Sequence, residues 1–176
     1  MNKNILIFGV IAGLIASSML IAMTITCYNT GKFEGNMLLG YTFMLVAFSF
    51  IFVGVKNYRD QFNGGVISFG KAFKIGAIIA LIAATLYVLI WLICYYFFVP
   101  DFMEKFTTNF LEGLKAKGKS AAEIKEEMAG MDFYRDMYKT PFGVILLTYM
   151  EILPVGLVIT LIASLILKRK EKLEAA

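Results

Sequence analysis

Four long apolar segments dominate the pattern of hydrophobic and polar positions along the chain. They cover residues 5–28, 37–55, 71–98 and 142–167, and almost no charged side chain interrupts them. A helix of about 20 apolar residues crosses the hydrocarbon core of a bilayer, so each segment is long enough to span a membrane. The pattern therefore predicts an all-α fold, with a four-helix transmembrane bundle.

Polar residues between these segments favour the same helices. The first two are separated by a short loop with two glycines, which predicts an antiparallel helical hairpin. Ser68 is suited to cap the third helix, and Thr140 with Pro141 is suited to begin the fourth. The first segment is longer than the apolar core of a signal peptide and no small-residue cleavage pattern follows, so we expect it to remain as a helix.

The segment 99–141, between the third and fourth spans, carries repeated helix signals. Asp101 follows a proline as a candidate cap, Ser120 and Glu123 form a capping box, and Gly130 is a natural helix end. We expect two or three short amphipathic helices that lie over the outer ends of the bundle and cap it, with a ligand or partner surface as the alternative. The first would present an apolar stripe at every fourth position, Phe102, Phe106, Phe110 and Leu114.

The distribution of charge predicts the orientation in the membrane. The turn between the second and third spans holds Lys56, Arg59, Lys71 and Lys74 against a single Asp60, and the tail that begins at Lys168 is also basic. Basic residues in short flanking loops stay on the cytoplasmic side. The two remaining loops have no comparable excess of bases, so both termini are expected in the cytoplasm.

Composition excludes several functional classes. Of 176 residues, 59% are hydrophobic and 17% charged, and the net charge of +4 comes from bases that flank the apolar segments, so we expect no nucleic-acid partner. Histidine is absent and only two cysteines occur, so we expect neither a metal nor another cofactor. Cys27 and Cys94 fall near the outer ends of two parallel helices, where they could pair; two free thiols fit equally well.

Two stretches carry a family resemblance. The turn reads KNYRD at 56–60 and NGGVISFGKAF at 63–73, and the fourth span contains EILPVG at 151–156. With these motifs the chain resembles the family catalogued as domain of unknown function 4199, over nearly its whole length. The resemblance implies a small protein of the bacterial inner membrane. It implies no activity and assigns no catalytic residue.

Small residues at helical spacing suggest close contacts between helices. Such rows let backbones approach in lipid, where apolar bulk supplies little drive for association. Packing within one bundle is the simpler interpretation, and homodimerisation through one row is the alternative. The rows are Gly9, Gly13 and Ser17; Ala72, Gly76, Ala80 and Ala84; and Gly156, Thr160 and Ser164.

The turn between the second and third spans could contact a phosphate. Asn63, followed by two glycines, permits a tight reversal with positive φ. Arg59, Lys71 and Lys74 lie near the start of the third helix and could bind an anionic lipid headgroup. A positive-inside anchor beside a tight turn is the alternative, and the spacing is not that of a Walker-type phosphate loop.

Glu151 is the only acidic residue inside a predicted span. It lies roughly 15 Å beyond Pro141, near the membrane midplane. An ionised carboxyl facing lipid is costly, so we expect it to face the bundle and to be mostly protonated. With Pro154, which removes a backbone donor, it resembles a transporter site; a neutral carboxyl bonded to a neighbouring helix is the alternative. Candidate partners at similar depth are Ser17, Ser18, Thr85 and Tyr87.

Three functions from different classes follow. The first is a non-enzymatic module that scaffolds or regulates a membrane-protein partner or a second copy of the chain. The second is a small transporter or channel subunit that uses Glu151. The third, an intramembrane enzyme, ranks last because the sequence offers no histidine, no paired intramembrane carboxylates and no nucleophile with a base. A polar cavity at Glu151 would favour the transporter, and a closed bundle the scaffold.

Overall fold

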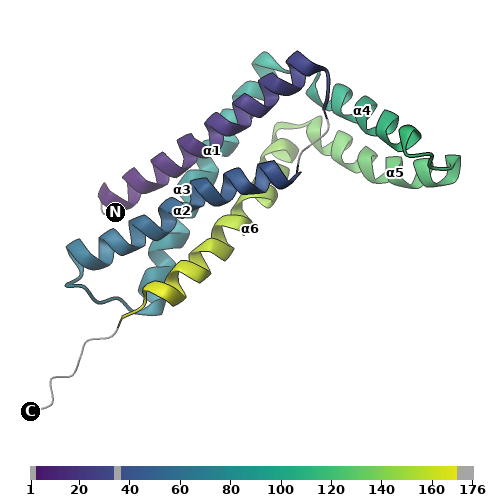
Figure 1. Ribbon diagram of the computed structural model, residues 1–176. Helices are drawn as coiled ribbons and strands as arrows, with labels where there is room; N and C mark the ends of the chain where they lie inside the picture. The colour runs from purple at the N-terminus through teal and green to yellow at the C-terminus, as the bar shows by residue number, and fades with distance from the viewer. Residues whose placement is uncertain (1–2, 34–36, 170–176) are drawn as a thin grey trace, which may run out of the picture.

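The structure, a computed structural model, describes residues 3–33 and 37–169. In this part of the chain it contains six α-helices, one π-helical turn and no strand, which confirms the all-α fold (Figure 1). Residues 34–36 and the basic tail beyond residue 169 lie outside the described part. The elements are α1 (Lys3–Thr30), α2 (Met37–Phe62), α3 (Phe69–Ile93), η1 (Cys94–Phe98), α4 (Phe102–Ala116), α5 (Ala121–Tyr138) and α6 (Pro141–Leu167).

The four predicted spans are confirmed as helices long and apolar enough to cross a membrane. They run over Lys3–Thr30, Leu38–Phe62, Phe69–Phe98 and Pro141–Leu167. The second is longer than the sequence pattern indicated, because the helix continues through the polar residues after Val55. Hydropathy marks the part of a helix that lies in hydrocarbon, whereas the helix itself ends only where the backbone turns.

Helix α3 lies at the centre of the bundle and contacts α1, α2 and α6. Its contact with α1 depends on glycines. A Cβ added to Gly9 would lie 2.7 Å from the Ile82 side chain, and one added to Gly13 would lie 3.0 Å from Leu86. Larger residues would push the two helices apart, so the small-residue row of α1 sets how closely it approaches α3.

The contact between α3 and α6 has the same character. A Cβ on Gly76 would lie 2.7 Å from Thr160, and one on Gly156 would lie 3.0 Å from both Ala80 and Phe48. The small-residue rows therefore pack inside one bundle, as the simpler interpretation held. They are buried within the chain and are not free to form the dimer contact that was the alternative.

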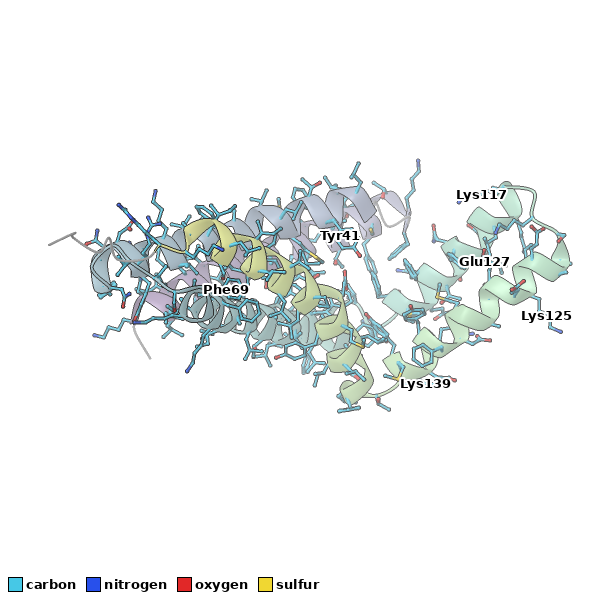
Figure 2. All side chains as sticks on the ribbon, turned by 90° about the horizontal axis from the view of Figure 1, so that it is seen from below. Tyr41, Phe69, Lys117, Lys125, Glu127 and Lys139 are labelled. Atoms are coloured by element: carbon cyan, nitrogen blue, oxygen red, sulfur yellow. The ribbon has the colours of Figure 1, made fainter. Side chains whose placement is uncertain are left out.

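Helices α4 and α5 form a hairpin that leaves the bundle to one side, with α5 nearer to α6 (Figure 1). In Figure 2 the labelled residues Lys117, Lys125 and Glu127 stand well away from the bundle, on which Tyr41 and Phe69 lie. The expectation that these helices lie over the outer ends of the bundle is therefore wrong. The hairpin is joined to the bundle at its base and projects beyond it.

Sequence signals at the helix ends were mostly correct. Ser68 accepts a hydrogen bond from the Lys71 N–H at 3.4 Å, Thr140 accepts one from Gly143 at 3.1 Å, and Ser120 forms its capping box with Glu123. Asp101 is at the N-cap of α4, but its side chain does not cap the helix.

One further expectation, the helix end at Gly130, was wrong. Helix α5 runs through Gly130 without a break, because Met131 is buried against the base of the hairpin and packing outweighs the weak helix propensity of glycine. Of the two states that the sequence left open for Cys27 and Cys94, the structure has the free one, since both thiols are unbonded and half-buried.

The two ends of the bundle are chemically distinct. The start of α1, the α2–α3 turn and the end of α6 lie together at one end, which we call the basic end (Figure 1). The α4–α5 hairpin leaves from the other, the hairpin end. Every candidate site from the sequence lies at one of these ends or along the membrane-spanning helices between them.

Candidate functional site

Glu151 lies on α6, and the structure places it on the exposed side of that helix. The buried stripe of α6 at this level is formed by Thr148 and Ile152, and Glu151 is turned about 100° from its neighbour Ile152. The residue is therefore exposed at the edge of this stripe and is not buried within the bundle as predicted, although its carboxyl lies near the buried Tyr87 of α3. The sequence located a costly acid in the span, but one residue of helical rotation decided which side it faces.

The surroundings of the Glu151 carboxyl are partly polar. It makes no hydrogen bond among the described residues, but it lies close enough to the phenols of Tyr87 and Tyr138 to interact with both electrostatically. Tyr87 is buried within α3, and burial raises the pKa of Tyr138 to about 12. Tyr138 thus keeps its proton at neutral pH. Of the partners proposed from sequence, Tyr87 is the one that the structure brings near Glu151.

The two serines of α1 do not meet Glu151. Ser17 is buried, and its Oγ has no hydrogen-bond partner in the described part of the chain. Ser18 is exposed and donates to the carbonyl of Ile15, one turn earlier, at 2.8 Å. Their depth in the membrane was matched to Glu151, but depth carries no information on which helices are neighbours.

Thr85 makes a different interhelical contact from the one predicted. Its Oγ1 lies 2.7 Å from the hydroxyl of Tyr149 on α6 and donates to the Leu81 carbonyl at 2.8 Å. A polar link between α3 and α6 therefore exists in the span, with Tyr149 in place of Glu151.

Pro154 does not end the helix, since α6 continues through it as one element.

The basic end is closed by the turn after α2. Gly64 and Gly65 have φ angles of +62° and +77°, which non-glycine residues rarely adopt. The Gly65 N–H donates to the carbonyl of Arg59 at 2.9 Å, and the Asn63 side chain donates to the carbonyl of Val66. These bonds end α2 and reverse the chain, as the asparagine and glycines predicted.

The same turn is joined to the end of α6. Ile67 and Arg169 exchange two backbone hydrogen bonds of 2.9 Å each, a short antiparallel bridge that we call the clasp. Arg59 adds a hydrogen bond of 3.3 Å to the carbonyl of Leu167. The clasp and this bond together tie the α2–α3 turn to the C-terminal end of α6.

Two of the three predicted anion-binding residues already have partners. Arg59 pairs with Asp60, with 2.6 Å between Nε and a carboxylate oxygen, and the Lys71 ammonium donates to the Asn63 side chain at 2.5 Å. Lys74 is exposed on α3. The motif therefore serves first to shape the loop, and Lys74 is the candidate that remains open to a headgroup.

At the hairpin end, α4 is tied to α1 by polar contacts that sequence analysis missed. The Tyr28 hydroxyl donates to Asp101 at 2.5 Å, and the Phe33 N–H donates to the Asn109 side chain at 3.3 Å. Lys105 pairs with Asp101 at 2.7 Å and its ammonium lies 4.2 Å from the centre of the Tyr28 ring. Hydrogen bonds from Lys105, and then from Tyr28, hold the pKa of Asp101 below its usual range.

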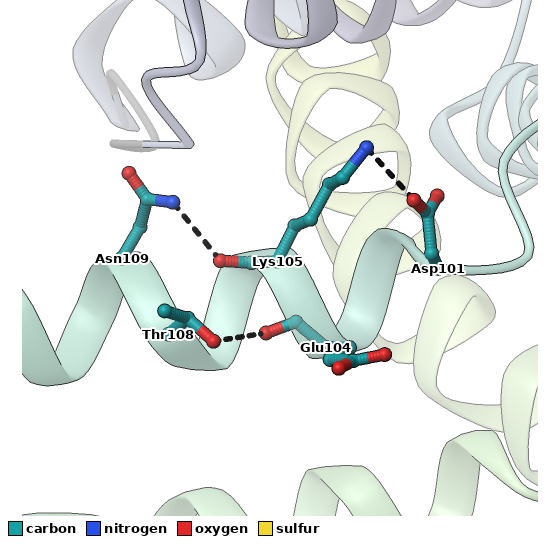
Figure 3. Close-up of a pocket in the computed structure, with 5 residues that line it drawn as sticks. All are labelled: Asp101, Glu104, Lys105, Thr108 and Asn109. Atoms are coloured by element: carbon teal, nitrogen blue, oxygen red, sulfur yellow. Dashed lines mark hydrogen bonds and ion pairs between the residues drawn. The ribbon is translucent and has the colours of Figure 1, made fainter.

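Asp101, Lys105 and Asn109 also help to line a shallow hollow of about 240 Å³ on α4. Figure 3 shows its lining, in which Lys105 reaches back to Asp101. The Thr108 hydroxyl and the Asn109 amide donate to backbone carbonyls of α4 itself. The spacing of Asp101 and Lys105 is a recognisable signal for an ion pair on a helix. No local signal points to Tyr28, which is remote in sequence. The lining residues are Asp101, Glu104, Lys105, Thr108 and Asn109.

An aromatic cluster, which we call the aromatic joint, fixes the base of the hairpin. Trp91 packs edge-to-face on Phe102 with ring centres 5.1 Å apart, and Tyr95 packs likewise on Tyr138 at 5.2 Å. Phe33 adds a further contact with Phe102 at 5.8 Å. Both helices of the hairpin are thereby attached to α3 and its π-helical extension.

In the described part of the chain, no three His, Cys, Asp or Glu side chains are grouped so as to hold a metal ion.

Comparison with known proteins supplies the family. The family model described as a protein of unknown function (DUF4199) matches residues 7–169, which is most of the chain. The chain belongs to the DUF4199 family. This confirms the resemblance carried by the turn and by the EILPVG segment, both of which lie within the matched region. No curated protein and no solved structure matches this DUF4199 chain.

Proposed function

We propose that this protein is a non-enzymatic module of the bacterial inner membrane that scaffolds or regulates a membrane-protein partner through its α4–α5 hairpin. The observation that carries the proposal is the attachment of the hairpin at several separate points. The aromatic joint holds both its helices, and Tyr28 and Phe33 hold α4 from a third segment. Such attachment presents one defined surface, which suits recognition of a partner.

The packing of the bundle also favours a scaffold over a pore. Glycines bring α1 and α6 into direct contact with α3, and Phe48 and Ile152 are fully buried between the helices. Close packing of this kind gives rigidity and leaves little room for a permeating solute.

The partner surface that we propose is the open side of α4. Glu104 and Thr108 are exposed there and line the hollow. A protein surface carrying a base and hydrogen-bond donors or acceptors would complement them. The attached residues Asp101, Lys105 and Asn109 would keep this surface in place.

The test compares two charge reversals on the hairpin in a tagged chain purified from its native membrane. Glu104→Lys changes the proposed surface, and Glu126→Lys is the matched control on α5. We expect a co-purifying membrane protein to be lost with Glu104→Lys and kept with Glu126→Lys, as quantified by mass spectrometry. Equal recovery with both variants would contradict the proposal.

We further propose that both termini and the basic end face the cytoplasm. The excess of bases in the α2–α3 turn supports this orientation. A reporter that is active only outside the cytoplasm should be active when fused after Lys117 and silent when fused after Asn63 or Lys172. In this orientation the exposed Lys74 would contact anionic headgroups of the inner leaflet, while Arg59 and Lys71 hold the loop.

A second candidate function is supported by Glu151. A carboxyl inside a span, without a hydrogen bond in the described residues but near Tyr87 and Tyr138, is a group that could exchange a proton. A small transporter or channel subunit would use it in that way. The conservative variant separates the two functions, because Glu151→Gln keeps the size of the side chain and cannot exchange a proton.

The measurement is proton movement in vesicles that contain the purified protein. If the protein is a transporter, Glu151→Gln should abolish proton movement and leave folding intact, whereas Glu151→Lys should also impair folding. If it is a scaffold, Glu151→Gln should behave like the native chain in both flux and co-purification.

A further inference from the structure

The two helices of the hairpin differ in what they expose. Among the described hairpin residues, the large apolar side chains left exposed are Phe133 and Tyr134, at 58% and 49%, and both belong to α5. The apolar residues Met103 and Leu114 of α4 are buried instead. One face of the hairpin is therefore suited to water, and the other presents adjacent aromatic rings that no part of the described chain covers.

The position of these rings points to what covers them. Phe133 and Tyr134 lie within the last two turns of α5, which leads directly into the membrane-spanning α6. Beyond this junction the first turn of α6 exposes Phe142, and the neighbouring η1 exposes Phe97 and Phe98, all within segments long and apolar enough to span a membrane. Figure 1 shows the hairpin running out to the side of the bundle, with α5 nearer to α6, and the main contacts of α5 within the described chain are with α4 and α6. A helix that leaves the end of a membrane-spanning bundle sideways has the membrane surface as its neighbour.

From these observations we propose that α5 lies in the headgroup region of the outer leaflet, with Phe133 and Tyr134 inserted among the lipids and α4 facing water. Aromatic rings at this depth are favourable because one part of the residue is apolar while the backbone and hydroxyl remain hydrated. The assignment to the outer leaflet rests on the orientation proposed above, whereas the insertion of the two rings holds whether or not α4 binds a partner.

The charges beside the two rings are compatible with this position. Asp132 pairs with Arg135 at 3.2 Å, and Asp136 pairs with Lys139 at 2.7 Å. Each acidic side chain next to the rings is therefore matched by a base on the same helix or just beyond it. Two local ion pairs remain in the hydrated headgroup layer without bringing net charge against the lipid.

The test uses tryptophan fluorescence in phosphatidylcholine vesicles whose acyl chains carry bromine, a quencher that acts over short distances. Phe133→Trp is compared with Glu112→Trp, which places the same ring on the exposed side of α4, and the signal of the native chain with its single Trp91 is subtracted from both. We expect the emission of Phe133→Trp to be blue-shifted and quenched. The emission of Glu112→Trp should be neither.

A second variant guards against a local effect of the first substitution. Tyr134→Trp should give the same blue shift and quenching. Equal and weak quenching at positions 112, 133 and 134 would overturn the proposal, because the hairpin would then stand clear of the membrane. A blue shift at 133 and 134 without quenching would also overturn it, since a protein, either a second copy or another chain, would then cover the rings.

Discussion

The basic end and the hairpin end of the bundle are held together in different ways. At the basic end, two glycines with positive φ, an asparagine and an arginine from one continuous motif form the turn, and the clasp adds one contact to α6. At the hairpin end, the principal contacts join residues far apart in the chain, such as Tyr28 with Asp101 and Phe33 with Asn109. One end is built mainly by local backbone conformation, and the other by tertiary packing.

The largest effect is expected from Gly143→Ala at the hairpin end. A Cβ there would lie 2.0 Å from the backbone carbonyl oxygen of Met137, so α5 and α6 would have to separate at their junction. Overpacking of this kind typically costs about 1–3 kcal/mol, and we expect at least this loss because the obstacle is backbone. The free energy of unfolding in detergent micelles measures it.

The matched control for that change is Gly113→Ala on α4, where an added Cβ meets nothing within 4 Å. This variant should be neutral or more stable by about 0.4–1 kcal/mol, because alanine restricts the unfolded chain. If Gly143→Ala were as stable as Gly113→Ala, the tight junction between α5 and α6 would be refuted.

At the basic end, Gly65→Ala should be the most damaging single change. The residue has a φ of +77°, and a side chain in the left-handed region costs about 1–2 kcal/mol. Gly70→Ala, nearby in open space and with ordinary φ, is the control and should cost nothing. Thermal unfolding of both variants decides the matter, and equal melting temperatures would show that the turn does not need its glycine.

Tyr28→Phe should have a smaller effect, confined to the hairpin end. It removes the hydrogen bond to Asp101, which is worth about 0.5–1.5 kcal/mol, with the low end expected because Asp101 is partly exposed. Tyr41→Phe, at an exposed tyrosine of α2, is the control and should be silent. The difference in unfolding free energy between the two variants measures the contact.

The same contact predicts a dependence on pH. Because the pKa of Asp101 is lowered in the folded protein, its contribution to stability is present above its unfolded pKa of about 3.9 and is lost as the pH falls through the folded value. Lys105 remains as a partner in Tyr28→Phe, so that variant should lose less stability on acidification than the native chain. An identical loss in both would argue against the Tyr28 contact.

The smallest effect is expected from Arg59→Lys. Lysine keeps the charge but loses the paired contacts with Asp60 and the hydrogen bond to Leu167, and at this surface, where solvent screens the ion pair, the loss of stability should be smaller than that of Tyr28→Phe. The control is Lys56→Arg, which exchanges the same two residue types in the opposite direction at a nearby position of α2. Faster hydrogen exchange at the clasp amides of Ile67 and Arg169 would be the most sensitive readout, and unchanged exchange would show that Arg59 does not support the clasp.

The candidate sites show where prediction from sequence stopped. The asparagine and glycines of the α2–α3 turn were recognised, because their conformational preferences act over a few residues. Glu151 was recognised as costly, but its place at the exposed edge of the buried stripe was not predicted, because this depends on which stripe of α6 packs on α2 and α3. The partners expected for it at equal depth, Ser17, Ser18 and Thr85, are bonded elsewhere or left buried without a bond.

The sequence by itself determined the class of the protein, its four membrane-spanning helices and most of its helix ends. Apolar runs, small-residue rows, caps and glycine turns are local or periodic signals, and their physical effects act within one helix or one turn. The spacing of the small-residue rows predicted close helix contacts, but only the structure showed that these contacts lie inside one bundle.

Only the tertiary structure decided the direction of the hairpin, the aromatic joint and the contacts of Tyr28 and Glu151. Each depends on the relative rotation of helices that are distant in the chain, and each is favoured by the sum of many weak contacts. Such a sum cannot be predicted from one residue or from one short segment of the sequence. For the same reason Gly130, which locally favours a helix end, lies inside α5, where the burial of Met131 outweighs it.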